Sequence, residues 1–221
     1  MEYAVPSGWG TSFTNLLISE CKEACIKVRN GYNGLSFTGC FLYGGSTETE
    51  RLLSIEQDSY GNSFIGGAIE GGVYGVYVDY AQISLDGVDF EVISENYIYI
   101  TGKYSPGLNF ASPICSATGC TFVGATNYAA IQVKGGMLDV SNSYFVTFNN
   151  NPDGKFAFYG EDGGDKQAGY DDRPCISTSN NHFRGWGSTI NVGNVFNRID
   201  NLATQISNTA QLNVKDVSGD T

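Results

Sequence analysis

Short apolar runs alternate with polar residues along most of the chain, and Gly, Asn or Ser interrupts each run. Six eight-residue segments share this pattern: 35–42, 62–69, 83–90, 115–122, 138–145 and 176–183. Positions one and three are mostly apolar and position two is Ser or Asp, which predicts a strand with one buried face. Position five is always Gly or Asn, which tolerate a left-handed backbone, so the chain is expected to turn there. Position eight is always large and apolar and returns to the core.

The segments start 27, 21, 32, 23 and 38 residues apart, so the repeat has turns of variable length. The similarity extends upstream, because 75–90 aligns with 130–145 without a gap. About three short strands in each coil predict an all-β fold, a right-handed single-stranded parallel β-helix. An ordinary β-sandwich is the alternative. We expect the β-helix to cover 16–190, with a long insertion near 149–174. Residues 1–15 are expected to form an N-terminal segment or cap, and 191–221 a C-terminal extension or cap.

The net charge of −11 argues against nucleic-acid binding, because an acidic surface repels phosphates. The first residues lack a basic and then apolar stretch, and no apolar run approaches the ~18 residues of a membrane span. We therefore expect no signal peptide and no membrane insertion. Six cysteines are expected to be mostly reduced core residues, and a single His leaves few ligands for zinc. We expect no metal and no cofactor.

The Gly/Asn column at position five and the apolar column at position eight resemble coils of the pectin-lyase-like β-helix superfamily. The missing signal peptide, the missing Asn-x-Ser/Thr sites and the abundant Tyr, Gly and Asn are more similar to a bacteriophage tailspike. The resemblance covers roughly 13–190. It implies a homotrimer on the virion tail that binds, and often cleaves, a bacterial surface polysaccharide at the host cell surface. The chain lacks the residue signatures of polygalacturonases and pectate lyases, which disfavours those two families.

Three carboxylates are the candidate catalytic residues. Glu70 and Glu91 both follow position eight and lie 21 residues apart, which is one coil. Direct stacking would place them about 5 Å apart at the backbone, and the pKa of one should then rise. A protonated carboxyl beside an ionised one is what glycoside hydrolysis requires. Asp89 is expected to face the same groove, whereas Asp86 belongs to an exposed column. The alternative is a solvated column of outward-facing side chains.

The insertion near 149–174 is the candidate substrate-binding region, because long loops on rigid scaffolds often carry binding sites. Its carboxylates and aromatic rings can hydrogen-bond to sugars and stack on them. Trp186 is a further candidate sugar platform, although a core or subunit contact suits it equally well. A surface loop or a trimer contact is the alternative for the insertion. The predicted substrate-binding residues are Tyr159, Tyr170, Asp171, Asp172 and Trp186.

These observations support three hypotheses. The first is a tailspike-like, endo-acting glycosidase that depolymerises a bacterial capsule or O-antigen. The second is a non-catalytic β-helix of a virion, with a receptor-binding or structural role. The third is a cellular polysaccharide lyase or epimerase.

Overall fold

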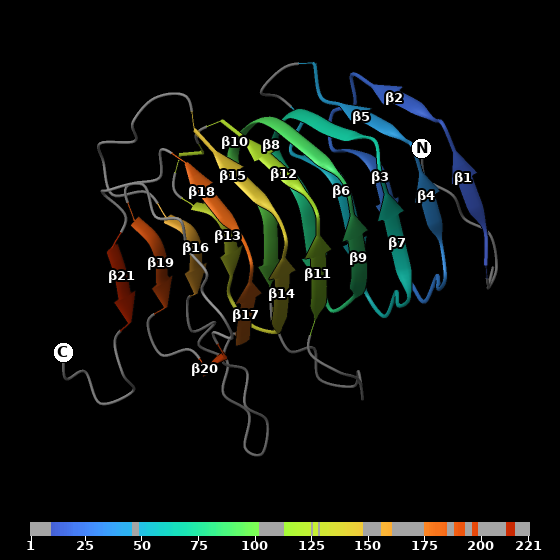
Figure 1. Cartoon of the computed structure of the whole chain (residues 1–221). Helices are drawn as coiled ribbons and strands as arrows, with labels where there is room; N and C mark the ends of the chain where they lie inside the picture. Colours follow the sequence, from blue (N-terminus) through green and yellow to red (C-terminus); the bar gives the residue numbers. More distant parts are fainter. Residues whose placement is uncertain are drawn as a thin grey trace.

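The described part of the chain is built of parallel strands, and each strand away from the two ends pairs with strands of both the preceding and the following coil. The computed structural model describes residues 10–45, 49–101, 113–124, 126–127, 129–147, 156–160, 175–184, 188–192, 196–198 and 211–214. Figure 1 shows the strands side by side in a solenoid that runs from β1 at one end to β21 at the other. The predicted parallel β-solenoid is therefore confirmed.

One sheet has eight strands, which we call the serine sheet. Its strands are, in order, β1 (Ser12–Thr14), β4 (Ser36–Thr38), β7 (Asn62–Ile65), β9 (Gln82–Asp86), β11 (Ile114–Thr118), β14 (Met137–Ser141), β17 (Cys175–Ser179) and β20 (Phe196–Arg198). The second sheet has 13 strands and contains two ladders. They are joined by the two long strands, β8 (Ala68–Asp79) and β10 (Asp89–Thr101).

The first residues of the two long strands pair in one ladder and their last residues pair in the other. The glutamate ladder adds β2 (Leu17–Ser19), β5 (Phe41–Tyr43), β12 (Thr121–Val123), β15 (Tyr144–Val146) and β18 (His182–Arg184). The tyrosine ladder adds β3 (Ala24–Val28), β6 (Arg51–Glu56), β13 (Ala129–Val133), β16 (Phe156–Gly160), β19 (Ser188–Val192) and β21 (Gln211–Val214). From β1 to β19, each coil thus contributes to the serine sheet, then the glutamate ladder, then the tyrosine ladder.

The observed register reproduces the columns of the sequence repeat. In the serine sheet Ser36 pairs with Ser63, which pairs with Ser84, and the column continues to Ser177. All six Gly or Asn residues at position five have φ between 51° and 63°. The backbone N–H of Gly87 donates to the carbonyl of Thr118 in the next coil at 2.9 Å, so pairing continues through this corner. The predicted turn at position five is confirmed.

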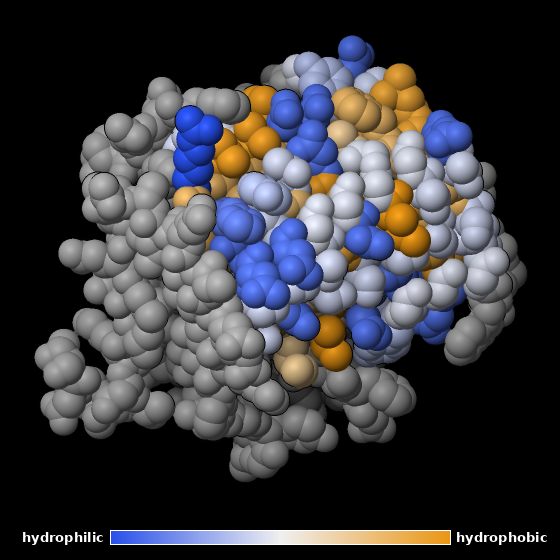
Figure 2. Space-filling view, in the orientation of Figure 1, coloured by the Kyte–Doolittle hydropathy of each residue, from blue (hydrophilic) through white to orange (hydrophobic). Residues whose placement is uncertain are grey.

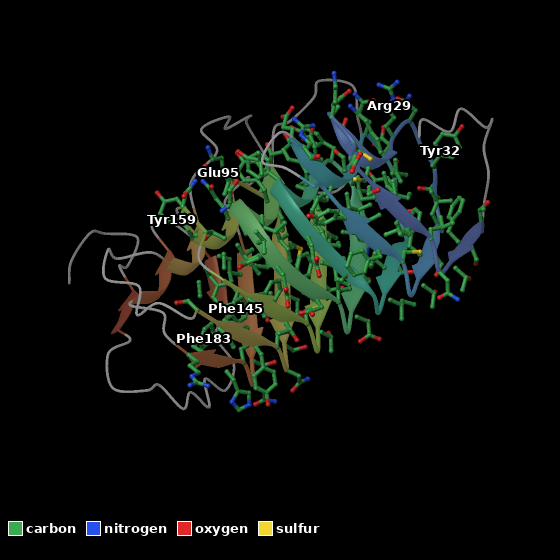
Figure 3. The ribbon with its side chains drawn as sticks, turned by 90° about the horizontal axis from the view of Figure 1, so that it is seen from above. Arg29, Tyr32, Glu95, Phe145, Tyr159 and Phe183 are labelled. Carbon is green, nitrogen blue, oxygen red and sulfur yellow. The ribbon has the colours of Figure 1, made fainter. Side chains whose placement is uncertain are left out.

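The interior between the sheets is filled by stacked side chains from successive coils. Position eight supplies a row of four phenylalanine rings, and neighbouring centroids lie 4.9, 4.5 and 4.9 Å apart with interplanar angles of at most 19°. The rings belong to Phe90, Phe122, Phe145 and Phe183, of which the last two are labelled inside the ribbon in Figure 3. Cys21, Cys25, Cys40, Cys115 and Cys120 are free thiols, and all of them except Cys21 are buried.

Gly67 lies at a corner where the backbone of the neighbouring coil approaches closely. A Cβ atom at Gly67 would lie 2.0 Å from the carbonyl oxygen of Cys40, which accepts the ladder bond from the N–H of Ala68. Gly67→Ala is therefore expected to lower the free energy of unfolding by roughly 3 kcal/mol, measured by urea denaturation. Gly66→Ala is the matched control, because Gly66 also has positive φ but no atom within 4 Å of the added Cβ. Equal losses in the two variants would contradict the steric argument.

The structure adds strands where the sequence predicted an insertion or a flanking segment. Phe156–Gly160, inside the predicted insertion near 149–174, forms β16, and Ala157 and Phe158 are fully buried. The sheets also include strands outside 16–190: β1 and β20 in the serine sheet and β21 in the tyrosine ladder. No helix in the described ranges is long and apolar enough to cross a membrane.

Candidate functional site

Two glutamates of neighbouring coils lie side by side on the outer face of the glutamate ladder. Glu70 of β8 pairs in register with Glu91 of β10, so their backbones lie one strand spacing apart, about 4.8 Å. The preceding residues, Ile69 and Phe90, are fully buried. Because side chains alternate along a strand, both glutamates point outward. The predicted stacking of the two glutamates is thus present.

Asp89 lies on the same outer face, two residues before Glu91. It occupies the rung next to Ala68, so it faces Glu70 diagonally across the two strands. Its Oδ1 atom is buried and has no hydrogen-bond partner among the described residues. Asp86 is separate, because it ends β9 in the serine sheet and is exposed. The structure therefore brings together three predicted catalytic residues and excludes Asp86.

Burial and like charges both favour the protonated form of Glu70. Partial burial raises the pKa of Glu70 most, and the charges of Glu91 and then Asp89 raise it further. Partial burial also raises the pKa of Asp89. A carboxyl whose pKa is raised, beside other carboxylates, has the chemistry of a general acid.

The raised pKa of Glu70 predicts a pH-dependent effect on stability. Its folded pKa lies above its unfolded value, so the folded state binds the proton more tightly, and stability declines as pH rises between the two values. Glu70→Gln removes this loss and is expected to raise the melting temperature slightly at pH 7 but not at pH 3. Thermal unfolding followed by circular dichroism across this range measures the difference. An equal change at both pH values would contradict the predicted linkage.

Aromatic and apolar side chains border the carboxylates along the axis of the solenoid. Tyr43, in the preceding coil, pairs with Glu70 and is 40% exposed, and Phe41 of the same strand is 36% exposed. Two coils after Asp89 in the same column lies Tyr144, which is 52% exposed and stacks on His182 with centroids 4.8 Å apart. Figure 2 shows hydrophilic and hydrophobic residues interspersed over the visible described surface.

Sequence reasoning did not select these aromatic residues. Phe41 and Tyr144 share a repeat column with Asp89, and Tyr43 shares one with Glu70. The columns were therefore visible in the sequence. What the sequence did not show is that these rings are exposed.

The tyrosine ladder carries a second group of outward side chains. Tyr77 and Tyr99 stack with centroids 5.5 Å apart, and Tyr74 packs against both at 6.2 and 5.2 Å. The Arg51 guanidinium lies 3.8 Å from the centroid of Tyr77, and the Lys134 ammonium 5.8 Å from that of Tyr99. These cation–π contacts and ring stacks cover the ring faces along the axis.

Burial raises the pKa of Tyr74, and it raises that of Tyr77 to about 12. Both phenols therefore remain hydrogen-bond donors at neutral pH. Glu56 holds Arg51 in place at one end of this group. It accepts hydrogen bonds from Arg51 at 3.0 Å and from Ser54 at 2.6 Å. The group is a rigid set of side chains that holds neighbouring coils together and presents hydroxyl groups.

Tyr159 is the one predicted substrate-binding residue that the structure describes. It is half-buried on β16, in the same column as Tyr77, Tyr99 and Gln132. Figure 3 places Tyr159 and Glu95 on the outer edge of the ribbon. Tyr159 therefore extends the tyrosine ladder, on a different face from Glu70. The other four lie outside the described residues: Tyr170, Asp171, Asp172 and Trp186.

No group of three His, Cys, Asp or Glu side chains suited to a metal ion occurs within the described ranges. The chain has no significant match among protein-family models, curated proteins or solved structures.

Proposed function

We propose that the protein binds a polysaccharide along the outer face of the glutamate ladder and cleaves it by glycoside hydrolysis. The proposal is carried by one observation: Glu70 and Glu91 pair in register on the outer face, and the pKa of Glu70 is raised. Their position at adjacent strands favours a retaining mechanism, in which the two carboxyl groups are about 5 Å apart.

Each carboxyl group then has one task. Glu70 donates its proton to the glycosidic oxygen while the carboxylate of Glu91 attacks the anomeric carbon, so the glycosidic bond breaks as a glycosyl ester forms. A water molecule then gives a proton to Glu70 and its hydroxide to the anomeric carbon. The ester breaks, and both glutamates return to their starting states.

Neighbouring side chains would hold the sugar chain over the glutamates. The buried Oδ1 of Asp89, which has no hydrogen-bond partner among the described residues, can accept a hydrogen bond from a sugar hydroxyl. Tyr43 and Phe41 on one side, and Tyr144 on the other, offer exposed rings for the apolar faces of sugars. Rings on both sides of the acid pair favour endo-cleavage, because sugar units extend past the site in both directions.

The substrate, the location and the oligomeric state that we propose follow from the resemblance of the sequence to tailspikes and the pectin-lyase-like superfamily. On this proposal the substrate is a bacterial capsule or O-antigen, the chain acts on the host surface from a virion tail, and it works as a homotrimer. Native mass spectrometry tests the oligomeric state, and a stable monomer would contradict the tailspike assignment.

Incubation with a panel of bacterial capsules and O-antigens, followed by product analysis, tests the activity. We expect new reducing ends in saturated oligosaccharides from at least one polysaccharide. Binding without new ends would support the non-catalytic alternative. Unsaturated products, which absorb in the near ultraviolet, would indicate a lyase, and altered stereochemistry without cleavage an epimerase.

A further inference from the structure

The residue that follows Glu91 has a backbone conformation that its side chain disfavours. Val92 has φ of 55° and is 74% exposed. A β-branched residue in the left-handed region is a genuine outlier, because its branched Cβ crowds the backbone. Strain of this kind persists only where the surrounding structure imposes it.

Neighbouring coils place glycine at the same corner. Glu91 pairs with Glu70 and Ile93 with Gly72, so the position between them holds Gly71 in one coil and Val92 in the next. Gly124 follows Val123, the next partner of Glu91. Both Gly71 and Gly124 have positive φ, at 67° and 115°. Glu20, at the equivalent position of the first coil, also has positive φ, at 56°. Val92 is the only β-branched residue with positive φ among the described residues, and its side chain resists this backbone conformation most.

The chain after Val92 is attached to the coils on both sides. The Ser94 hydroxyl donates to the carbonyl of Gly72 at 3.3 Å, and the carbonyl of Ser94 accepts from the N–H of Asn127 at 2.6 Å. The Asn127 amide also donates to Glu95 at 2.8 Å. The register with β8 shifts between Ile93 and Asn96, which makes a β-bulge at this point. Bulges redirect side chains and are frequent beside active sites.

We propose that Val92 is a positioning residue that fixes the carboxylate of Glu91 beside Glu70. The catalytic role of Val92 rests on the proposed hydrolysis, but its effect on the position of Glu91 does not. The isopropyl group of Val92 reduces the number of backbone conformations that this residue can adopt. The paired strands and the hydrogen bonds of Ser94 keep Val92 in its strained, left-handed conformation. A glycine would make the same turn without strain, but it would let Glu91 move away from Glu70.

Val92→Gly tests the proposal, because strain relief and loss of positioning have opposite effects. We expect the melting temperature to rise by a few degrees as the strain is removed. We expect kcat on a cleaved polysaccharide to fall about tenfold with little change in KM. The pKa of Glu70, followed by carboxyl-carbon NMR, should fall towards its ordinary value as the Glu91 charge moves away.

Gln57→Gly is the matched control, because Gln57 is also an exposed non-glycine residue with positive φ, at 47°, at another corner. It should change neither kcat nor the pKa of Glu70. If Val92→Gly stabilises the fold and leaves the pKa of Glu70 and kcat unchanged, the valine has no positioning role and the proposal is overturned. If the wild type cleaves no polysaccharide, the hydrolysis proposal fails, and the NMR titration alone decides whether Val92 positions Glu91.

Discussion

Replacing Glu70 by Gln is expected to lower the rate of polysaccharide cleavage by about 10²–10⁴-fold, because the amide cannot donate a proton to the leaving oxygen. Glu91→Gln should lower it at least as much, since it removes the proposed nucleophile. Both substitutions preserve side-chain size on an outer face, so the fold should remain intact. Initial rates of reducing-end release, with circular dichroism to verify folding, provide the measurement.

Asp86→Asn is the control for this experiment. Asp86 lies three residues before Asp89 in sequence, but it is exposed on the serine sheet. Its loss changes the net charge by the same amount as either glutamine variant and should leave the rate within about twofold. Cleavage at the wild-type rate by both Glu70→Gln and Glu91→Gln would remove this pair from the mechanism.

Phe122→Ala is expected to lower the free energy of unfolding by about 4 kcal/mol, the largest loss of stability that we predict. Phe122 is fully buried in the row of four phenylalanines, with Phe90 and Phe145 stacked on its two faces at 4.9 and 4.5 Å. Its removal opens a cavity and ends both stacking contacts. Because the sheets around it are held on both sides by paired strands, the cavity cannot collapse easily. Urea denaturation measures the loss.

Tyr144→Ala serves as the comparison for the core substitution. Tyr144 belongs to the same ladder but is 52% exposed, so its loss should cost less than about 1 kcal/mol. Phe122→Leu keeps most of the buried volume and should cost about 1–2 kcal/mol. A loss below 1 kcal/mol in Phe122→Ala would contradict the view that stacked rings hold the coils together.

The columns of the repeat were predictable because parallel coils place equivalent residues next to one another. The corners at Gly87 and Asn142, the buried row ending at Phe183 and the pairing of Glu70 with Glu91 all follow from that rule. The strand Phe156–Gly160 was not predicted, because polar, loop-like stretches flank it, NNNPDGK before it and EDGGD after it, and obscure its apolar pattern.

Local features of the site were less accessible from the sequence. The strain at Val92 depends on a corner that the neighbouring coils impose, and valine by itself indicates an ordinary strand. The sequence assigned Asp86, Asp89 and Glu91 to three separate columns, and the structure agrees. The structure also shows that separate columns can share a face, because Asp89 and Glu91 lie two residues apart on the same strand, β10.

The central claim is that Glu70 and Glu91 act as a coupled pair, and NMR titration of Glu70 tests it most directly without any knowledge of the substrate. In the wild type the pKa of Glu70 should lie above its ordinary value. In Glu91→Gln it should fall, although burial and Asp89 keep it partly raised. An ordinary pKa for Glu70 in the wild type, or the same value in both proteins, would contradict the claim.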